Sequence, residues 1–127
     1  VLVVDDAASN RKLLQMLLKR TGFGTVEAVD DGRAAVQYCE AAALEGDPPK
    51  ILFMDNTMPN LTGIEATKII RAGGYKGLII GVTGNSLEEE LDEFITAGAD
   101  LVIVKPLKNQ TIEMLLGFIQ ANGFDSA

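Results

Sequence analysis

The stretch ILFMD at residues 51–55 joins an unbroken apolar run to a carboxylate. Four apolar residues in a row, without alternation, are typical of a strand that helices cover on both faces, as in a parallel sheet. Short runs of this kind recur along the chain and are separated by longer segments of helical periodicity. The predicted strands are Val1–Val4, Thr25–Val29, Ile51–Met54, Leu78–Val82 and Leu101–Val104.

The segments between these strands carry the start and stop signals of five short amphipathic helices. Two of the helices begin at capping-box patterns, in which a hydroxyl residue precedes a glutamate by three positions. The predicted helices run from about Ser9 to Arg20, from about Gly32 to Leu44, onward from Thr62, onward from Ser86 and from about Asn109 to Ala121. Five βα units predict an open, doubly wound α/β sheet, because a barrel of eight such units needs about twice the length.

The composition is that of one globular domain, with 47% hydrophobic and 23% charged residues among 127. We therefore predict a single domain over residues 1–127, with Val1–Val4 as a clipped first strand. The formal net charge of −7 argues against direct binding to nucleic acid or to an anionic membrane, since both need basic surfaces. No apolar run approaches the roughly 18 residues of a membrane span.

Two residue counts restrict the chemistry. The chain has no histidine, which excludes catalysis by Ser-His or Cys-His pairs and removes the commonest general base. Its one cysteine, Cys39, has no partner for an intrachain disulfide and is typical of a reducing compartment. We therefore expect the chain in a reducing compartment such as the cytoplasm.

Chemically capable side chains follow four of the five predicted strands. In open α/β sheets, ligands bind outside the carboxyl ends of the strands, so these side chains are expected to share one site. They are Asp5, Asp6, Asp55, Thr83 and Lys105. Asp30 and Asp31 follow the second strand and lie away from the site if that strand is at the edge of the sheet.

The residue types at this rim favour phosphoryl transfer. Three neighbouring carboxylates raise one another's pKa, and a hard divalent cation such as Mg²⁺ relieves their repulsion. Lys105 and Thr83 are donors that suit phosphate oxygens, and Gly84 lets the backbone approach closely. Each residue taken singly also has a structural explanation, as a helix cap, a turn residue or a solvated tip. Together they predict a site in which a carboxylate is the nucleophile.

Four motifs in this order and spacing resemble the receiver domain of two-component response regulators. The motifs are VVDD at residues 3–6, DNTMP at 55–59, VTG at 82–84 and VKP at 104–106, and the resemblance covers the whole chain. It implies a flavodoxin-like (βα)5 fold with strand order 2-1-3-4-5. It also implies a domain that assists its own phosphorylation and dephosphorylation but is no stand-alone enzyme.

The resemblance further implies a role for each site residue. Asp55 is the expected phosphoacceptor, and its donor is a phosphohistidine on a histidine kinase or histidine phosphotransfer domain. Mg²⁺, with Mn²⁺ as an alternative, is expected on Asp6, Asp55 and the backbone carbonyl of Thr57, with Asp5 acting through a coordinated water. The expected phosphoryl contacts are Thr83, Lys105 and the backbone N–H groups of Asn56, Thr57 and Gly84. The peptide bond before Pro106 is expected to be cis.

Some residues depart from the family pattern and leave alternatives open. Val102 stands three positions before Lys105, where the family often has an aromatic switch residue, so a receiver-like interaction module that does not switch is an alternative. A Mg²⁺-dependent phosphatase commonly needs an acid where this chain has Thr57. We interpret Glu88–Glu90 as acids that favour a helix N-terminus. The particular amino acids in these motifs favour a receiver that is fused to a sensor kinase.

Overall fold

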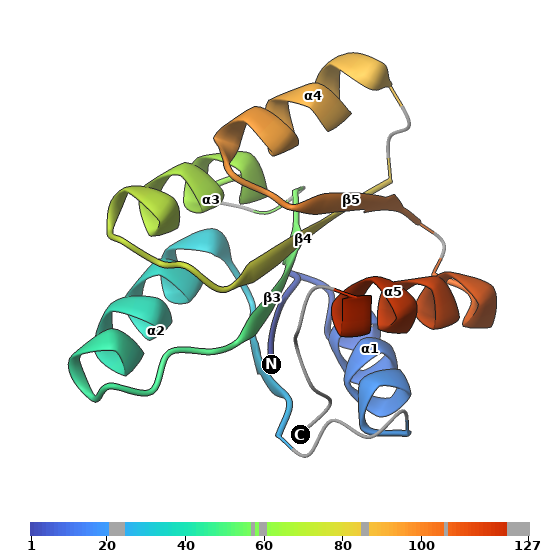
Figure 1. The fold of residues 1–127 in the computed structure, drawn as a ribbon, viewed down its shortest axis with the longest axis horizontal. Coiled ribbons are helices and arrows are strands. Elements are labelled where there is room, and N and C mark those ends of the chain that lie inside the picture. The colour runs from blue at the N-terminus through green and yellow to red at the C-terminus, as the bar shows by residue number, and fades with distance from the viewer. Residues whose placement is uncertain (21–24, 57, 59–60, 85–86, 106, 122–127) are drawn as a thin grey trace.

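The computed structural model describes the chain except for residues 21–24, 57, 59–60, 85–86, 106 and 122–127. Over the described residues, five strands alternate with five helices (Figure 1). The strands are β1 Leu2–Val4, β2 Glu27–Val29, β3 Ile51–Asp55, β4 Leu78–Thr83 and β5 Leu101–Val104. The helices are α1 Ala8–Arg20, α2 Gly32–Leu44, α3 Gly63–Ala72, α4 Glu88–Ala97 and α5 Asn109–Ala121.

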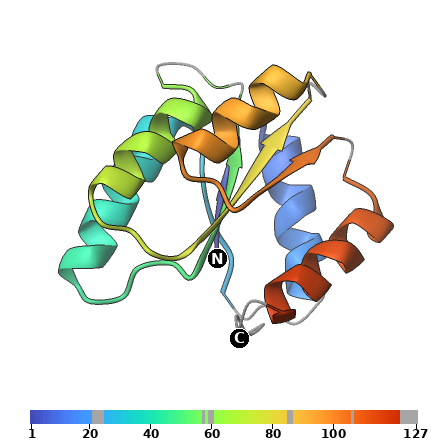
Figure 2. The ribbon, with the colours of Figure 1, turned by 45° about the horizontal axis from the view of Figure 1, so that its top comes forward.

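The strands form one parallel sheet in the order β2-β1-β3-β4-β5, which confirms the predicted topology. Helices α2, α3 and α4 cover one face of the sheet, and α1 and α5 cover the other (Figure 2). Alternate residues of a strand therefore enter different cores. Leu52 and Met54 pack beneath α2, α3 and α4, whereas Ile51 and Phe53 pack beneath α1 and α5.

Burial follows position in the sheet. Every residue of the central strands β3 and β4 is buried, as their unbroken apolar sequence predicts. The four residues of β5 are equally apolar but only half-buried, because β5 is an edge strand. In the part of the chain that the structure describes, no helix is long and apolar enough to cross a bilayer.

One predicted helix start is confirmed and the other is shifted. Thr62 caps α3 through a complete capping box: its hydroxyl accepts from the Glu65 N–H at 3.2 Å, and the Glu65 carboxylate accepts from the Thr62 N–H. The prediction that α4 begins at Ser86 is wrong, because the helix starts further along the chain, at Glu88. The N-cap residue is Leu87, which offers no side-chain cap, and Ser86 itself lies outside the described residues. Glutamates in the first turn of α4 favour its N-terminus instead.

Two glycines allow helices to lie close to the sheet beside the strand ends. A Cβ on Gly63, the first residue of α3, would collide with the backbone carbonyl of Asp55. A Cβ on Gly81 in β4 would lie 3.0 Å from the ring of Phe94, a fully buried residue of α4. These two close approaches set the positions of α3 and α4 relative to the carboxyl edge of the sheet.

The opposite end of α3 is held by Arg71. Its guanidinium donates to the carbonyls of Gly98, Tyr75 and Gly77 at 2.8–3.0 Å and pairs with the Asp100 carboxylate at 2.9 Å. One side chain therefore joins the end of α3 to the segments that lead into β4 and β5.

Candidate functional site

Three carboxylates converge at the carboxyl edge of the sheet. Asp5 and Asp6 follow β1, and Asp55 is the last residue of β3, the neighbouring strand. One carboxylate oxygen from each of the three lies within 4.8 Å of the others. Asp5 and Asp55 are buried, whereas Asp6 is exposed to solvent. The cluster therefore has two acids in the protein interior and one on the side that a soluble ion would approach.

The acids after β2 do not join this cluster. β2 lies at the edge of the sheet, as the resemblance implies. Asp31 caps α2 instead, because its carboxylate accepts from the Ala34 N–H at 2.7 Å. Position in the sheet thus separates the acids of the site from the acid that caps a helix.

Lys105 provides the positive charge of the site. Its Nζ lies 3.0 Å from Oδ1 of Asp55 and 3.4 Å from Oδ2 of Asp5. Its backbone N–H donates to the Thr83 carbonyl at 2.8 Å, which holds the residue beside the end of β4. Burial alone would lower the pKa of Lys105, but the hydrogen bond to Asp55 and the charges of Asp55 and Asp5 outweigh it and raise the pKa. The ammonium is therefore charged at neutral pH.

Asp5 is fixed by several contacts of its own. Its Oδ1 accepts from the Ala7 N–H at 2.9 Å, and its backbone carbonyl accepts from the Arg11 guanidinium at 2.9 Å. Since its second oxygen faces Lys105, both oxygens of this carboxylate already have partners. The Asp5 carboxylate is therefore held in place by the start of α1 and by Lys105.

Asp55 is the acid of the cluster whose pKa is shifted upward. Burial, with smaller contributions from Asp5 and Asp6, raises its pKa from 3.8 to about 6, although Lys105 opposes the shift. The donor set consists of hard carboxylate oxygens with an excess of negative charge, which fits Mg²⁺. A divalent cation at this position would favour the ionised form of Asp55.

A further hydrogen-bonded group adjoins Asp55. The buried Thr83 hydroxyl donates to Oε1 of Glu90 at 3.0 Å, and the Asn56 side-chain amide donates to the same oxygen. The Asn56 side-chain carbonyl in turn accepts from the Ile64 N–H at 3.1 Å, near the start of α3. Glu88–Glu90 lie in the first turn of α4, as interpreted, and Glu90 has in addition a hydrogen-bonding role beside Asp55 that the sequence did not predict.

Sequence reasoning missed Glu90 because three consecutive acids at a helix start look alike. In the structure Glu88 and Glu89 are exposed, whereas Glu90 is half-buried. A signal was present: Glu90 precedes the buried Phe94 by four positions, so both side chains lie on the helix face that points to the sheet. This spacing distinguishes Glu90 from its two neighbours.

The predicted backbone donors differ in availability. The Asn56 N–H donates to the Val82 carbonyl at 3.1 Å and is already engaged. Gly84 is exposed and lines a cavity of about 390 Å³ together with Asp5, Asp55 and Lys105. Thr57 and the predicted cis bond at Pro106 lie outside the described residues.

Val102 lies in β5 opposite Gly81 of β4. It is half-buried and packs against the core beneath α2, α3 and α4, the core that contains Phe94. The position that the family often gives to an aromatic is therefore filled by a short, packed side chain.

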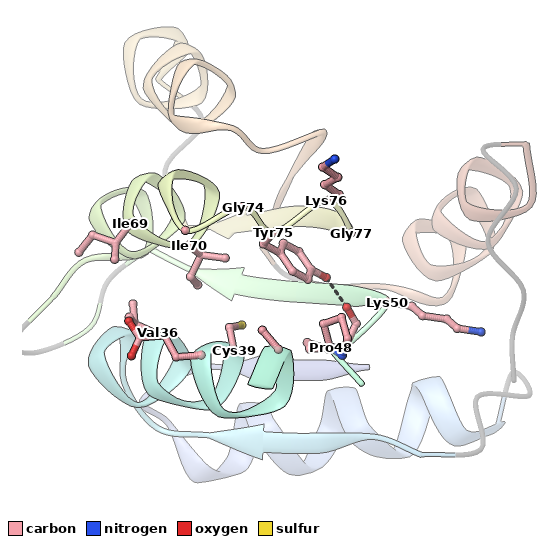
Figure 3. A pocket seen from close by; sticks show the side chains of 14 residues that line it. Val36, Cys39, Pro48, Lys50, Ile69, Ile70, Gly74, Tyr75, Lys76 and Gly77 are labelled. Atoms are coloured by element: carbon pink, nitrogen blue, oxygen red, sulfur yellow. Dashed lines mark hydrogen bonds between the residues drawn. The ribbon is translucent and has the colours of Figure 1, made fainter. Parts of the chain in front are cut away.

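A second pocket lies between α2 and α3, in the region of the loops that lead into β3 and β4 (Figure 3). It has a volume of about 460 Å³ and is mainly apolar, with Cys39 and Ile70 among its walls. The Tyr75 hydroxyl donates to the Pro49 carbonyl at 2.6 Å across one side of it. Burial raises the pKa of Cys39 to about 11, so the thiol is protonated and unreactive. This pocket lacks the converging charges of the site at the carboxyl edge.

Comparison with known families identifies the class of protein. The family model of the response regulator receiver domain matches residues 1–116. The chain belongs to this family, and the fold, the strand order and the acidic cluster at the carboxyl edge agree with that assignment. It is a receiver domain of two-component signalling and not a stand-alone enzyme.

The relatives include both short regulators and long kinases. The chain is 38% identical over 117 residues to the two-component response regulator ORR41 of Oryza sativa subsp. japonica, covering 91% of this chain and 90% of that protein. It is 27% identical to the osmosensing histidine protein kinase SLN1 of Saccharomyces cerevisiae, covering 91% of this chain but 10% of that protein.

A solved structure gives the same fold. The crystal structure of the receiver domain of the histidine kinase CKI1 from Arabidopsis thaliana, complexed with Mg²⁺ and BeF₃⁻, superposes with a TM-score of 0.79 at 34% identity. The superposition covers 94% of this chain and 88% of that chain.

Proposed function

We propose that this receiver domain accepts a phosphoryl group on Asp55 from a phosphohistidine. In this step an oxygen of the Asp55 carboxylate attacks phosphorus, the phosphorus–nitrogen bond breaks, and the imidazole leaves and takes up a proton. The observation that most supports this proposal is the position of Asp55. It is buried at the end of β3, lies 3.0 Å from Lys105 and belongs to the carboxylate cluster. With a pKa of about 6, the carboxylate is mainly ionised at neutral pH, as a nucleophile must be.

Mg²⁺ is the cofactor that this proposal requires, with Mn²⁺ as an alternative. Asp6, Asp55 and the Thr57 carbonyl would hold the ion, and Asp5 would act through a coordinated water. When bound, the ion supplies charge neutralisation between the carboxylates and the phosphoryl oxygens. Support comes from the geometry of the cluster and from the related CKI1 receiver, whose structure is a complex with Mg²⁺ and BeF₃⁻.

The remaining site residues would bind the phosphoryl oxygens. Lys105 is close enough to contact them directly, and the Thr83 hydroxyl lies at the end of the next strand. Gly84 and Thr57 would add backbone N–H groups, whereas the Asn56 N–H contributes only if its bond to Val82 opens. Such fixed donors stabilise charge that develops on the transferred group.

The donor belongs to another domain or another protein, since the chain contains no histidine. We propose a histidine kinase or a histidine phosphotransfer domain as the partner, in the cytoplasm or in the cytosolic portion of a sensor kinase. The net charge of −7 disfavours nucleic acid or an anionic membrane as a direct partner.

The test is incubation with Mg²⁺ and a small acyl phosphate, followed by intact-mass measurement. The wild-type protein should gain one phosphoryl group, and Asp55→Asn should gain none. Asp92→Asn is a matched control because Asp92 is an exposed acid of α4. A wild-type protein that forms no adduct with any acyl phosphate or phosphohistidine donor would refute the proposal.

A receiver-like interaction module that does not switch is a second candidate, favoured by the short side chain of Val102 in place of an aromatic. Mg²⁺ and beryllofluoride, a phosphoryl analogue, separate the two. Changes in amide resonances from α4 to α5 would reject the non-switching module, and unchanged resonances outside the immediate site would support it.

A further inference from the structure

Glu90 shares one carboxylate oxygen between two residues of the phosphorylation site. Oε1 accepts from the Thr83 hydroxyl at 3.0 Å and from the Asn56 side-chain amide. Thr83 ends β4, Asn56 directly follows Asp55, and Glu90 lies in the first turn of α4. The contact therefore links the strand ends around the acceptor to a helix whose Phe94 and Ala97 pack against the core.

The Thr83 hydroxyl can donate to only one acceptor at a time. A threonine hydroxyl has one hydrogen, so the Thr83 hydroxyl cannot donate to Glu90 and to a phosphoryl oxygen at once. The orientation of Asn56 is set at both ends, since its amide nitrogen faces a carboxylate and its carbonyl accepts from the Ile64 N–H. In the resting geometry the Thr83 hydroxyl and the Asn56 side-chain amide thus both donate to Glu90.

Charge acts in the same direction. Phosphorylation adds about −1.5 to −2 charge to the acceptor. The Glu90 carboxylate is held by residues adjacent to that acceptor, so the new charge would repel it while competing for the Thr83 hydrogen. Both effects favour release of Glu90 from the site.

We infer that Glu90 is a positioning residue that holds Thr83 and Asn56 in the resting state and must be released when a phosphoryl group arrives. The inference rests on the proposed function and adds to it the residue that opposes the phosphorylated state. Release of Glu90 frees the first turn of α4, so occupancy of Asp55 is transmitted to a helix surface without an aromatic at Val102.

The neighbouring glutamate provides a matched control. Glu89 lies in the same helical turn and carries the same charge, but it is exposed. Glu90→Ala and Glu89→Ala therefore change the charge at the helix N-terminus equally, and they differ in the contact to Thr83 and Asn56. Glu90→Gln keeps the acceptor oxygen but removes the charge, which separates competition for the hydrogen from repulsion.

The experiment is an NMR titration of the Mg²⁺-loaded domain with beryllofluoride. Glu90→Ala should bind about tenfold more tightly than wild type, in line with the loss of a hydrogen bond to a charged acceptor. Glu90→Gln should fall between them, and Glu89→Ala should stay within about twofold of wild type. In a Thr83→Ala background, the effect of Glu90→Ala should shrink, because the two residues act through one bond.

A readout without ligand accompanies the titration. The Asn56 side-chain amide resonances should move in Glu90→Ala and not in Glu89→Ala. If the wild-type protein binds beryllofluoride and Glu90→Ala binds it equally well, the inference is overturned and the proposed function stands. If the wild-type protein binds no beryllofluoride, the proposed function fails first, and an unmoved Asn56 resonance would show separately that Glu90 makes no such contact.

Discussion

Replacing Asp55 by asparagine is expected to stabilise the metal-free protein at neutral pH. Burial raises the pKa of Asp55 from 3.8 to about 6, so the folded protein holds this proton more tightly than the unfolded chain does. One pKa unit corresponds to about 1.4 kcal/mol, which gives about 3 kcal/mol for the ionised residue at pH 7.5. A neutral amide of the same shape avoids that cost.

The sign of the pH dependence follows from the direction of the shift. Between about pH 4 and pH 6 the folded state binds more protons than the unfolded state, so the Asp55 contribution to stability falls as the pH rises. Above pH 6 the cost is fully present, and below pH 4 both states are protonated. Asp55→Asn should therefore exceed wild type by about 3 kcal/mol at pH 7.5 and by little at pH 4.

Urea unfolding with a chelator at both pH values measures this difference. A gain of about 3 kcal/mol moves the urea midpoint by about 1–2 M for a domain of this size. Glu113→Gln removes an exposed acid of α5 and should change the unfolding free energy by less than about 0.5 kcal/mol. The reasoning is refuted if Asp55→Asn gains nothing at pH 7.5, or gains as much at pH 4.

Three further substitutions or reactions test the packing. Gly81→Ala places a Cβ 3.0 Å from the Phe94 ring and should lower the unfolding free energy by about 1–3 kcal/mol in urea. Arg71→Lys loses the planar fork that reaches three carbonyls and Asp100, and should cost about 2 kcal/mol in the same assay. Because burial raises the pKa of Cys39 to about 11, iodoacetamide at pH 8 should alkylate it slowly in the native protein and rapidly in urea, as followed by intact mass.

Local sequence signals were sufficient to predict the strands and helices, whereas the strand order followed from the resemblance to receiver domains. Unbroken apolar runs predict β3 and β4, and the capping box at Thr62 predicts the start of α3, which the structure confirms. The convergence of Asp5 and Asp55 also follows from topology, since both side chains stand at carboxyl ends of adjacent parallel strands.

The features that sequence reasoning missed depend on contacts between distant segments. Whether a glutamate in the first turn of α4 faces solvent or Thr83 depends on how Phe94 seats the helix on Gly81. The Asn56 N–H looks available in the sequence, but the ladder between β3 and β4 assigns it to the Val82 carbonyl. Such assignments arise from tertiary packing and have no local pattern.

The pairing of Lys105 with Asp5 joins residues that are 100 positions apart in the chain. During synthesis, the carboxylates emerge from the ribosome long before the lysine that neutralises them. A nascent chain that ends before β5 has Asp5 and Asp55 but lacks Lys105, their counter-charge, and the strand that precedes it. We therefore expect the carboxylate cluster to gain its counter-charge only when translation of the domain is nearly complete.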